Sequence, residues 1–275
     1  MKNIGLLFCL FFVSTTCFSQ KTSDSTQNSK KGDFYFYWGW NWGWYTKSTI
    51  DFKGNDHDFT LQKVRAKDRQ SKFKLDYFNP STATIPQYNF RIGYYITDKF
   101  SLTLGTDHMK YVVQPYQMVK IDGQIFDTNR GFDGNYENEY IEILPEFLRF
   151  EHTDGLNYVN TELRYLNELM GSKRIKLSIV NGLGVGALFP KTNVTLWNSE
   201  RYDEFHLSGF GINGMLGANV AFGQVFFFQT ELKGGYFNMP DIRTTSSELD
   251  SAKQDFFFSQ LNIVFGANLR SKKNK

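Results

Sequence analysis

Apolar and polar residues alternate with a period of two over several long segments of this sequence. The clearest segment is 34–45, FYFYWGWNWGWY, whose alternate residues are all aromatic: Phe34, Phe36, Trp38, Trp40, Trp42 and Trp44. Successive side chains of a β-strand point to opposite faces, so one face of this strand is aromatic and the other is small or hydroxylated. We therefore predict a strand whose aromatic face is covered by a protein core or by lipid.

Seven further segments alternate in the same way and predict strands at residues 88–96, 100–113, 156–167, 173–188, 208–222, 225–238 and 256–269. The connections between the strands are alternately long and short. The long ones, at 46–87, 114–155, 189–207 and 239–255, read as loops, and Asp122-Gly123 in the second predicts a hairpin turn. Outer-membrane barrels have an even number of strands, brief periplasmic turns and longer external loops. The fold predicted is all-β, a transmembrane eight-stranded antiparallel up-and-down barrel.

The apolar lane of these strands must face either lipid or a core, because soluble barrels alternate too. An eight-stranded barrel has an interior only just wide enough for side chains, so eight lanes of Phe, Trp, Tyr, Leu and Ile would overfill it. The central part of the apolar lane also carries no charge, as exposure to lipid requires. We therefore predict that the aromatic residues of 34–45 face lipid and that the opposite lane fills the lumen.

The inward lane combines glycines with charged and amide side chains near the middle of the strands. The polar network predicted for the lumen consists of Asn41, Arg91, Glu162, Arg164, Gln229, Glu231, Lys233, Gln260 and Asn262. The charges should pair, since an unpaired charge in a narrow dry lumen is costly. Two roles stay open for this network: filling a plugged lumen, or controlling a narrow channel for small solutes. A wide porin is excluded, because an aqueous channel takes about 16–18 strands.

The start of the chain predicts export. Residues 1–19 combine a positive charge, an apolar run and small residues before the cleavage point, which is typical of a secretory signal peptide. Cys17 leaves a lipoprotein open, although Ser14-Thr15-Thr16 fit the lipid-modification pattern poorly. The remaining organisation predicted is a flexible periplasmic lead-in at 20–33, the barrel at 34–269 and a basic C-terminal tail at 270–275.

The WGWNWGWYT segment, the eight-strand rhythm and a signal ending in Ser-Gln resemble the small OmpA/OmpX-type outer-membrane β-barrels, in particular the "outer membrane beta-barrel" proteins of Bacteroidetes. The resemblance covers most of the mature chain. It implies residence in the bacterial outer membrane, in contact with its lipid. The last strand ends at Leu269 and lacks the terminal aromatic residue of many such barrels. We expect a monomer with no cofactor, and an extracellular partner engaged through the long loops; the net charge of +3 gives no reason to expect nucleic-acid binding.

Two other groups of residues raise the question of chemistry. His108, after Asp107 at the outer end of one strand, and His152 with Asp154 at the start of its neighbour suggest a catalytic rim site, since a His beside a carboxylate can act as a general base. The small outer-membrane barrels include lipid A acyltransferases and deacylases, so a lipid-modifying enzyme is the alternative function. No serine stands in a recognisable arrangement, and we expect no catalytic role.

Acidic stretches in the loops suggest metal ligands. They are His57 with Asp51, Asp56 and Asp58 in the first loop, and Asp127, Asp133, Glu137 and Glu139 in the second. The second set matches no EF-hand spacing, and the first fits a solvated turn equally well. We therefore predict no metal site, and expect the loops to contact surface partners or to cover the barrel mouth.

Overall fold

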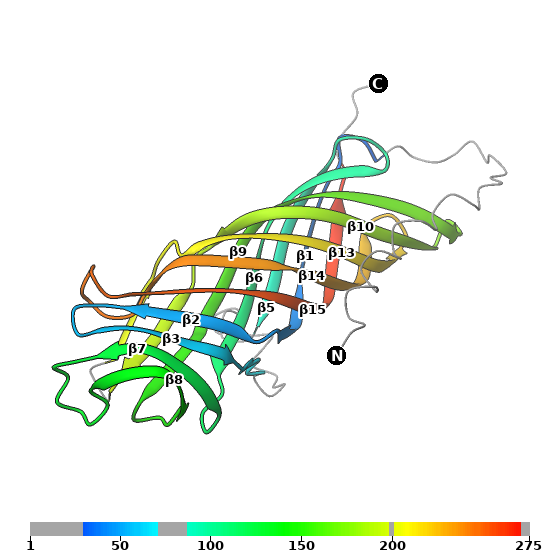
Figure 1. Cartoon of the computed structure of the whole chain (residues 1–275). Coiled ribbons are helices and arrows are strands. Elements are labelled where there is room, and N and C mark those ends of the chain that lie inside the picture. The colour runs from blue at the N-terminus through cyan, green and yellow to red at the C-terminus, as the bar shows by residue number, and fades with distance from the viewer. Residues whose placement is uncertain (1–29, 71–86, 198–200, 271–275) are drawn as a thin grey trace.

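The computed structural model describes residues 30–70, 87–197 and 201–270, all of them in strands or their connections (Figure 1). No helix occurs in this part of the chain, and it contains no helical segment that could span a membrane. The predicted signal peptide, most of the lead-in and most of the basic tail lie outside the described residues. The last residues of the lead-in are described: the Gly32 amide donates to the Tyr95 carbonyl at 2.8 Å, which ties this segment to the barrel.

Eight long strands form a closed antiparallel ring, which confirms the predicted barrel. In ring order they are β1 (Phe34–Tyr45), β5 (Tyr88–Tyr95), β6 (Phe100–Val113), β9 (Leu148–Gly171), β10 (Ile175–Leu188), β13 (Gly209–Phe222), β14 (Phe226–Arg243) and β15 (Ser251–Leu269). The ring closes where β1 pairs with β15, from Phe34 opposite Leu269 to Tyr45 opposite Phe258. Closure leaves no open sheet edge in the membrane, where an unpaired backbone group would cost several kcal/mol.

The predicted long loops are largely strands, which corrects the sequence interpretation. The additional strands are β2 (Ser48–Lys53), β3 (His57–Val64), β4 (Ala66–Lys67), β7 (Met118–Ile125), β8 (Gly134–Glu142), β11 (Lys191–Leu196) and β12 (Tyr202–Phe205). The barrel sheet continues from β15 through β2, β3 and β7 to β8, while β11 pairs with β9 and β12. Figure 1 shows β2, β3, β7 and β8 side by side at one end of the molecule. The fourth long loop shrinks to residues 244–250, because β14 and β15 both extend into it.

The turn predicted at Asp122-Gly123 is also wrong. These residues lie inside β7, and the connection to β8 is 126–133. The pairing of β7 with β8 shifts register between Ile121 and Gly123, and Gly123 has φ +118°. The Asp-Gly pair therefore serves a bulge, which needs the same left-handed backbone freedom as a hairpin turn.

The inward and the outward side chains of the barrel strands change polarity at the same position along the strand, as β15 shows. Its inward lane passes from Asn262 and Gln260 to Phe258 and Phe256, all buried. Its outward lane passes from exposed Phe257 to the exposed charges of Asp255 and Lys253. The strand is therefore apolar outside and polar inside over one half, and the reverse over the other. A search for one alternation pattern recognises only the first half, which is why the predicted strand began at residue 256.

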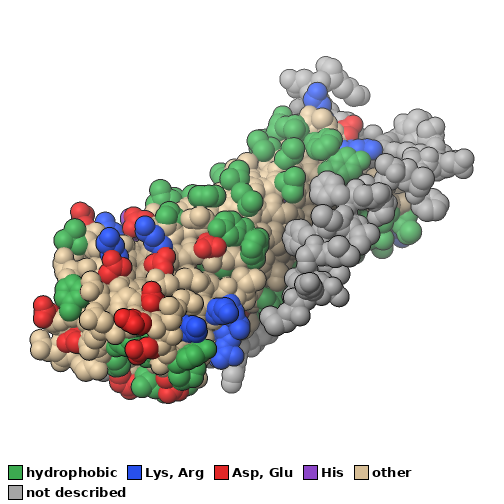
Figure 2. Space-filling model, in the orientation of Figure 1, with side chains coloured by type: hydrophobic (Ala, Val, Ile, Leu, Met, Phe, Trp, Pro, Cys, Tyr) green, Lys and Arg blue, Asp and Glu red, His purple; other side chains and the backbone are tan. Residues whose placement is uncertain are grey.

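The half with the apolar exterior carries a belt of exposed hydrophobic side chains. Leu104, Leu183 and Leu232 are each at least 60% exposed, and Phe34, Phe36 and Trp44 are exposed too. Trp38, Trp40 and Trp42 are half-buried among their neighbours on the outer surface. Figure 2 shows hydrophobic side chains over this half and charged ones gathered on the other. A belt of this kind around a closed ring fits a hydrocarbon environment, and spanning barrels of this build belong to the outer membrane.

The half with the charged exterior has an apolar core of its own. The core lies between the barrel strands and the added strands, and includes Phe52, Phe59, Ile121, Phe150 and Trp197. Short turns at 96–99, 172–174 and 223–225 lie at the opposite end of the ring, which is the periplasmic end in such barrels. The added strands are therefore extracellular, and they extend the barrel into a separately packed domain.

Candidate functional site

The lumen of the membrane half holds many buried polar side chains. Period-two alternation aims them inward from β1, β5, β6, β9, β14 and β15, and glycines on neighbouring strands leave room for them. A Cβ on Gly184 would lie 2.5 Å from Glu162 Cγ, and one on Gly105 would lie 3.1 Å from Arg91 Cγ. The inward glycines therefore leave the space that the long charged side chains occupy.

Six charged side chains meet at the centre of the lumen, each at most 2% exposed: Arg91, Asp107, Glu162, Arg164, Glu231 and Lys233. Glu162 is the hub, with ion pairs to Arg164 at 2.6 Å, Lys233 at 2.8 Å and Arg91 at 3.2 Å. Asp107 pairs with Lys233 at 2.7 Å, and Glu231 pairs with Arg164 at 2.8 Å. Three cations balance three carboxylates, so this cluster carries no net charge.

Neutral side chains complete the hydrogen bonds of these charges. The Tyr37 hydroxyl accepts from Arg91 Nε at 3.0 Å and from Arg164 Nη2 at 2.7 Å, and donates to Glu231 Oε1 at 3.0 Å. Asn160 joins Arg91 to Asp107, accepting at 2.8 Å and donating at 3.0 Å. Buried charges are tolerated when they are both paired and hydrogen-bonded. The six charges are therefore both paired and hydrogen-bonded.

All nine residues predicted for the lumen are buried in it. Most of them are hydrogen-bonded to one another: Gln229 donates to Glu231 at 2.6 Å, and Asn262 donates to Glu231 at 3.1 Å. Gln260 is different, because neither polar atom of its side chain has a hydrogen-bond partner within the described structure. Sequence reasoning missed Asp107 and Tyr37. Both lie in the inward lanes read from the sequence, so parity was a sufficient signal, but Asp107 had been assigned to the rim beside His108.

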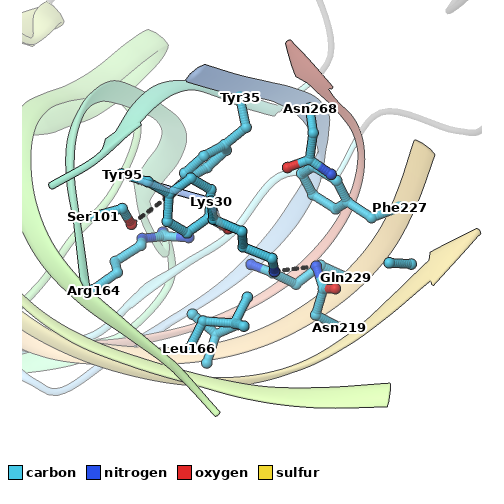
Figure 3. A pocket seen from close by; sticks show the side chains of 12 residues that line it. Lys30, Tyr35, Tyr95, Ser101, Arg164, Leu166, Asn219, Phe227, Gln229 and Asn268 are labelled. Atoms are coloured by element: carbon cyan, nitrogen blue, oxygen red, sulfur yellow. Dashed lines mark hydrogen bonds between the residues drawn. The ribbon is translucent and has the colours of Figure 1, made fainter. Parts of the chain in front are cut away.

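A small cavity lies at the periplasmic mouth of the lumen (Figure 3). Lys30 reaches into it with its ammonium 5.4 Å from the centre of the Tyr95 ring, and Arg164, Ser101 and Asn219 also line it. Its volume of about 20 Å³ is room for about one water molecule. The cavity at this mouth is therefore small.

The structure gives the two rim histidines separate surroundings. His108 keeps the outward parity of Thr106, but its ring is only 6% exposed, because it stacks on Tyr88 at 5.0 Å. Its Nδ1 lies 2.8 Å from Asn157 Oδ1. His152 points into the extracellular core, where its Nδ1 lies 2.8 Å from Thr192 Oγ1. The side chain of Asp154 lies outside the described part.

Burial lowers the pKa of His152 to about 3, so its imidazole is neutral at ordinary pH. It packs against the rings of Tyr111 and Phe150 in the extracellular core. A ring enclosed in this way cannot reach a lipid substrate at the membrane surface. His152 therefore fits a packing role in the extracellular core.

The acidic stretches of the extracellular strands serve structure in the described residues. His57 is buried against Phe59 and Trp197 with its Nδ1 2.6 Å from Asp56 Oδ1, while Asp58 points to the opposite, exposed face. Asp133 accepts the backbone amides of Thr128 and Asn129 within the turn before β8. Among the residues that the structure describes, no three His, Cys, Asp or Glu side chains are grouped to hold a metal ion.

No protein-family model and no curated protein matches this chain. Solved structures similar to it include the outer-membrane protein OprG from Pseudomonas aeruginosa, at 15% identity over 88% of this chain and 98% of that one, with a TM-score of 0.39. The outer-membrane protein AlkL has 9% identity over 94% and 100% of the two chains, with a TM-score of 0.41.

The attachment invasion locus protein Ail of Yersinia pestis has 9% identity over 87% and 99% of the two chains, with a TM-score of 0.31. Another similar structure is the outer-membrane protease OmpT of Escherichia coli, at 6% identity over 90% and 100% of the two chains and a TM-score of 0.25. The neighbours therefore differ in role. The fold class of this chain follows from its own closed strand ring and apolar belt, and it is a small outer-membrane β-barrel.

Proposed function

We propose that this protein is a sealed outer-membrane barrel that anchors and displays its extracellular strands, with a structural or surface-interaction role. The observation that carries the proposal is that side chains fill the interior in both the membrane half and the extracellular half. A neutral, fully paired charge cluster occupies the membrane half, and an apolar core occupies the extracellular half.

An open pathway would require displacement of both the charge cluster and the apolar core. Each charge of the lumen lies within 4 Å of an opposite charge and is at most 2% exposed, so a passing ion would have to displace ion pairs that are already formed. Above them, the rings of Tyr111, Phe237 and Phe256 close the axis of the barrel with apolar surface. Eight strands leave no spare width beside these side chains.

The extracellular strands supply the surface for interaction. Segments carried on a rigid scaffold are where recognition is commonly placed, and here seven additional strands extend the barrel beyond the membrane. The proposal includes contact of the apolar belt with outer-membrane lipid, a monomeric state and a partner bound outside the cell. Membership in the Bacteroidetes "outer membrane beta-barrel" group is part of the same proposal, supported by the tryptophan-rich β1.

Planar-bilayer recording tests the sealed lumen. The purified full chain should give no steady single-channel conductance, and neither should Glu231→Gln, because Tyr37, Gln229 and Asn262 still fill the site. Glu168→Gln is the matched control, since that carboxylate pairs with Lys176 beside the 172–174 turn and outside the central charge cluster. Steady conductance that changes with Glu231→Gln and not with Glu168→Gln would replace the proposal with the narrow-channel function.

Lipid analysis tests the alternative function of a lipid-modifying enzyme. Cells that express the wild type, His108→Ala and His152→Ala should show the same outer-membrane acyl pattern by mass spectrometry. An acyl change that depends on the wild-type protein and is lost in both variants would overturn the non-enzymatic role.

A further inference from the structure

The cavity at the periplasmic mouth (Figure 3) is lined by cationic and neutral side chains, and by no carboxylate of the described residues. Its charged lining residues are Lys30 and Arg164, and its neutral polar ones include Ser101, Asn219 and Gln229. Its volume of about 20 Å³ is room for about one water molecule, which suits a single-atom ion better than sulfate or phosphate with their four oxygens. The charge of the lining favours an anion.

The Lys30 ammonium has no counter-charge in this cavity. Its contact there is with the Tyr95 ring, whose centre lies 5.4 Å away and which carries no charge. Burial lowers the pKa of Lys30, and the positive charge of Lys176 lowers it further. Three carboxylates of the described part oppose this shift, although none forms an ion pair with Lys30 within 4 Å: Glu168, Asp33 and Asp98. Glu168 instead pairs with Lys176 at 2.9 Å. An anion in the cavity supplies the negative charge that Lys30 lacks.

The cavity also contains hydrogen-bond donors that the protein does not use. The hydroxyls of Tyr35 and Ser101 lie 3.1 Å apart, and we call them the hydroxyl pair. Whichever of the two donates to the other, the second hydroxyl proton has no acceptor among the described residues. Asn219 Nδ2 carries two protons and donates one of them to Gln229 Oε1 at 2.8 Å. An ammonium with further N–H and O–H donors is a set of groups that recognises an anion.

The end of the lead-in is fixed to the barrel, so Lys30 is held in place at the cavity. The Gly32 amide donates to the Tyr95 carbonyl at 2.8 Å. The Lys31 amide donates to Asp98 Oδ1 at 3.1 Å in the periplasmic turn after β5. These bonds fix the backbone directly after Lys30, and Figure 3 shows the Lys30 side chain extending into the cavity. The side chain of Lys31, in contrast, is exposed.

We propose that the periplasmic cavity binds a small inorganic anion of the size of chloride, held by the Lys30 ammonium, the hydroxyl pair and the second N–H of Asn219. The six charges of the lumen cluster already balance one another, so they do not neutralise Lys30. The anion balances this additional cation. The inference concerns the periplasmic mouth alone and holds whichever role the extracellular strands have.

Chloride NMR of the full chain in phosphatidylcholine nanodiscs tests the inference, because chloride that exchanges with a protein site gives a broadened signal. The broadening should saturate as the chloride concentration rises. Lys30→Gln should lose at least about tenfold in affinity, since it removes the charged donor. Lys31→Gln is the matched control. It removes the same charge one residue away, from an exposed side chain, and should bind chloride like the wild type.

Bromide gives the position of the anion by anomalous X-ray scattering. Crystals of the full chain soaked in bromide should show a peak in the cavity beside Lys30, and crystals of Lys30→Gln should show none there. Broadening that does not saturate would mean that the cavity holds water alone and would overturn the proposal. Equal losses in Lys30→Gln and Lys31→Gln would mean attraction by the net charge of the lead-in, and a bromide peak only elsewhere would place the anion outside this cavity. Either result would refute the site.

Discussion

Replacement of Arg164 by Met tests whether the lumen cluster holds the barrel together. Arg164 is the only cation within 4 Å of the Glu231 carboxylate among the described residues, and donates to it at 2.8 Å. Glu162, in contrast, keeps Lys233 and Arg91 when Arg164 is lost. The substitution therefore leaves one buried carboxylate, Glu231, without a counter-charge.

The expected cost follows from that orphaned charge. Removal of one partner from a buried ion pair typically costs about 3–5 kcal/mol, and Glu231 is 1% exposed. Its remaining donors, Tyr37, Gln229 and Asn262, are neutral and replace only part of the lost interaction. We expect Arg164→Met to lower the free energy of unfolding by about 3–5 kcal/mol, and the double variant with Glu231→Gln to recover at least about half of that loss, since the orphaned carboxylate is gone.

Urea unfolding in lipid vesicles, followed by tryptophan fluorescence, measures these differences. Lys176→Met is the control, because the Lys176–Glu168 pair has a similar distance of 2.9 Å but side chains 31% and 27% exposed, and should cost less than about 1 kcal/mol. Equal losses in Arg164→Met and Lys176→Met would refute the reasoning, as would a double variant that is no more stable than Arg164→Met alone.

Three further predictions concern the packing, the belt and the extracellular core. Gly93→Ala should cost about 1–3 kcal/mol, since its Cβ would lie 2.2 Å from Tyr35 Cζ; the same urea assay should show most of this loss removed in a Tyr35→Ala background. Leu104→Arg should cost about 2–4 kcal/mol in vesicles because it places a cation in the hydrocarbon, whereas Leu249→Arg, equally exposed but extracellular, should change stability by less than about 0.5 kcal/mol; equal costs would argue against the belt. The folded-state pKa of His152 is about 3, below its unfolded value of about 6.5, so the unfolded chain binds the extra proton between these values. Its contribution to stability is complete above about pH 6.5 and should fall by about 1.4 kcal/mol per pH unit below it; thermal unfolding against pH should lose this slope in His152→Gln, and an unchanged slope would contradict the assignment.

The barrel strands were predictable because lipid imposes one simple pattern on them. The limits predicted for β1 and β6 agree with the structure, and those for β5, β10 and β13 differ by at most two residues. β9, β14 and β15 were predicted too short for a physical reason. Beyond the membrane the inward lane is apolar and the outward lane is charged, so the alternation inverts: Phe256 is buried while Asp255 and Lys253 are exposed.

The lumen residues were likewise readable from parity, but their pairing was not. Alternation assigns Arg91, Glu162 and Lys233 to the interior without saying at what height each lies. The stagger between strands decides that: Glu162 is opposite Gly184 on β10 and Thr103 on β6, and this register brings three cations around it. The height of Asp107 was misjudged in the same way. It was assigned to the rim with His108, although the two side chains face opposite sides of β6.

The sequence by itself determined an eight-stranded barrel with an outward apolar lane and an inward polar lane, because local alternation and the rhythm of the connections carry that information. Only the tertiary structure decided that the long connections form a second, apolar-cored extension, that the six lumen charges balance in one cluster, and that His108 and His152 have separate surroundings. These features depend on contacts between residues distant in sequence, and no local pattern specifies which distant residues meet.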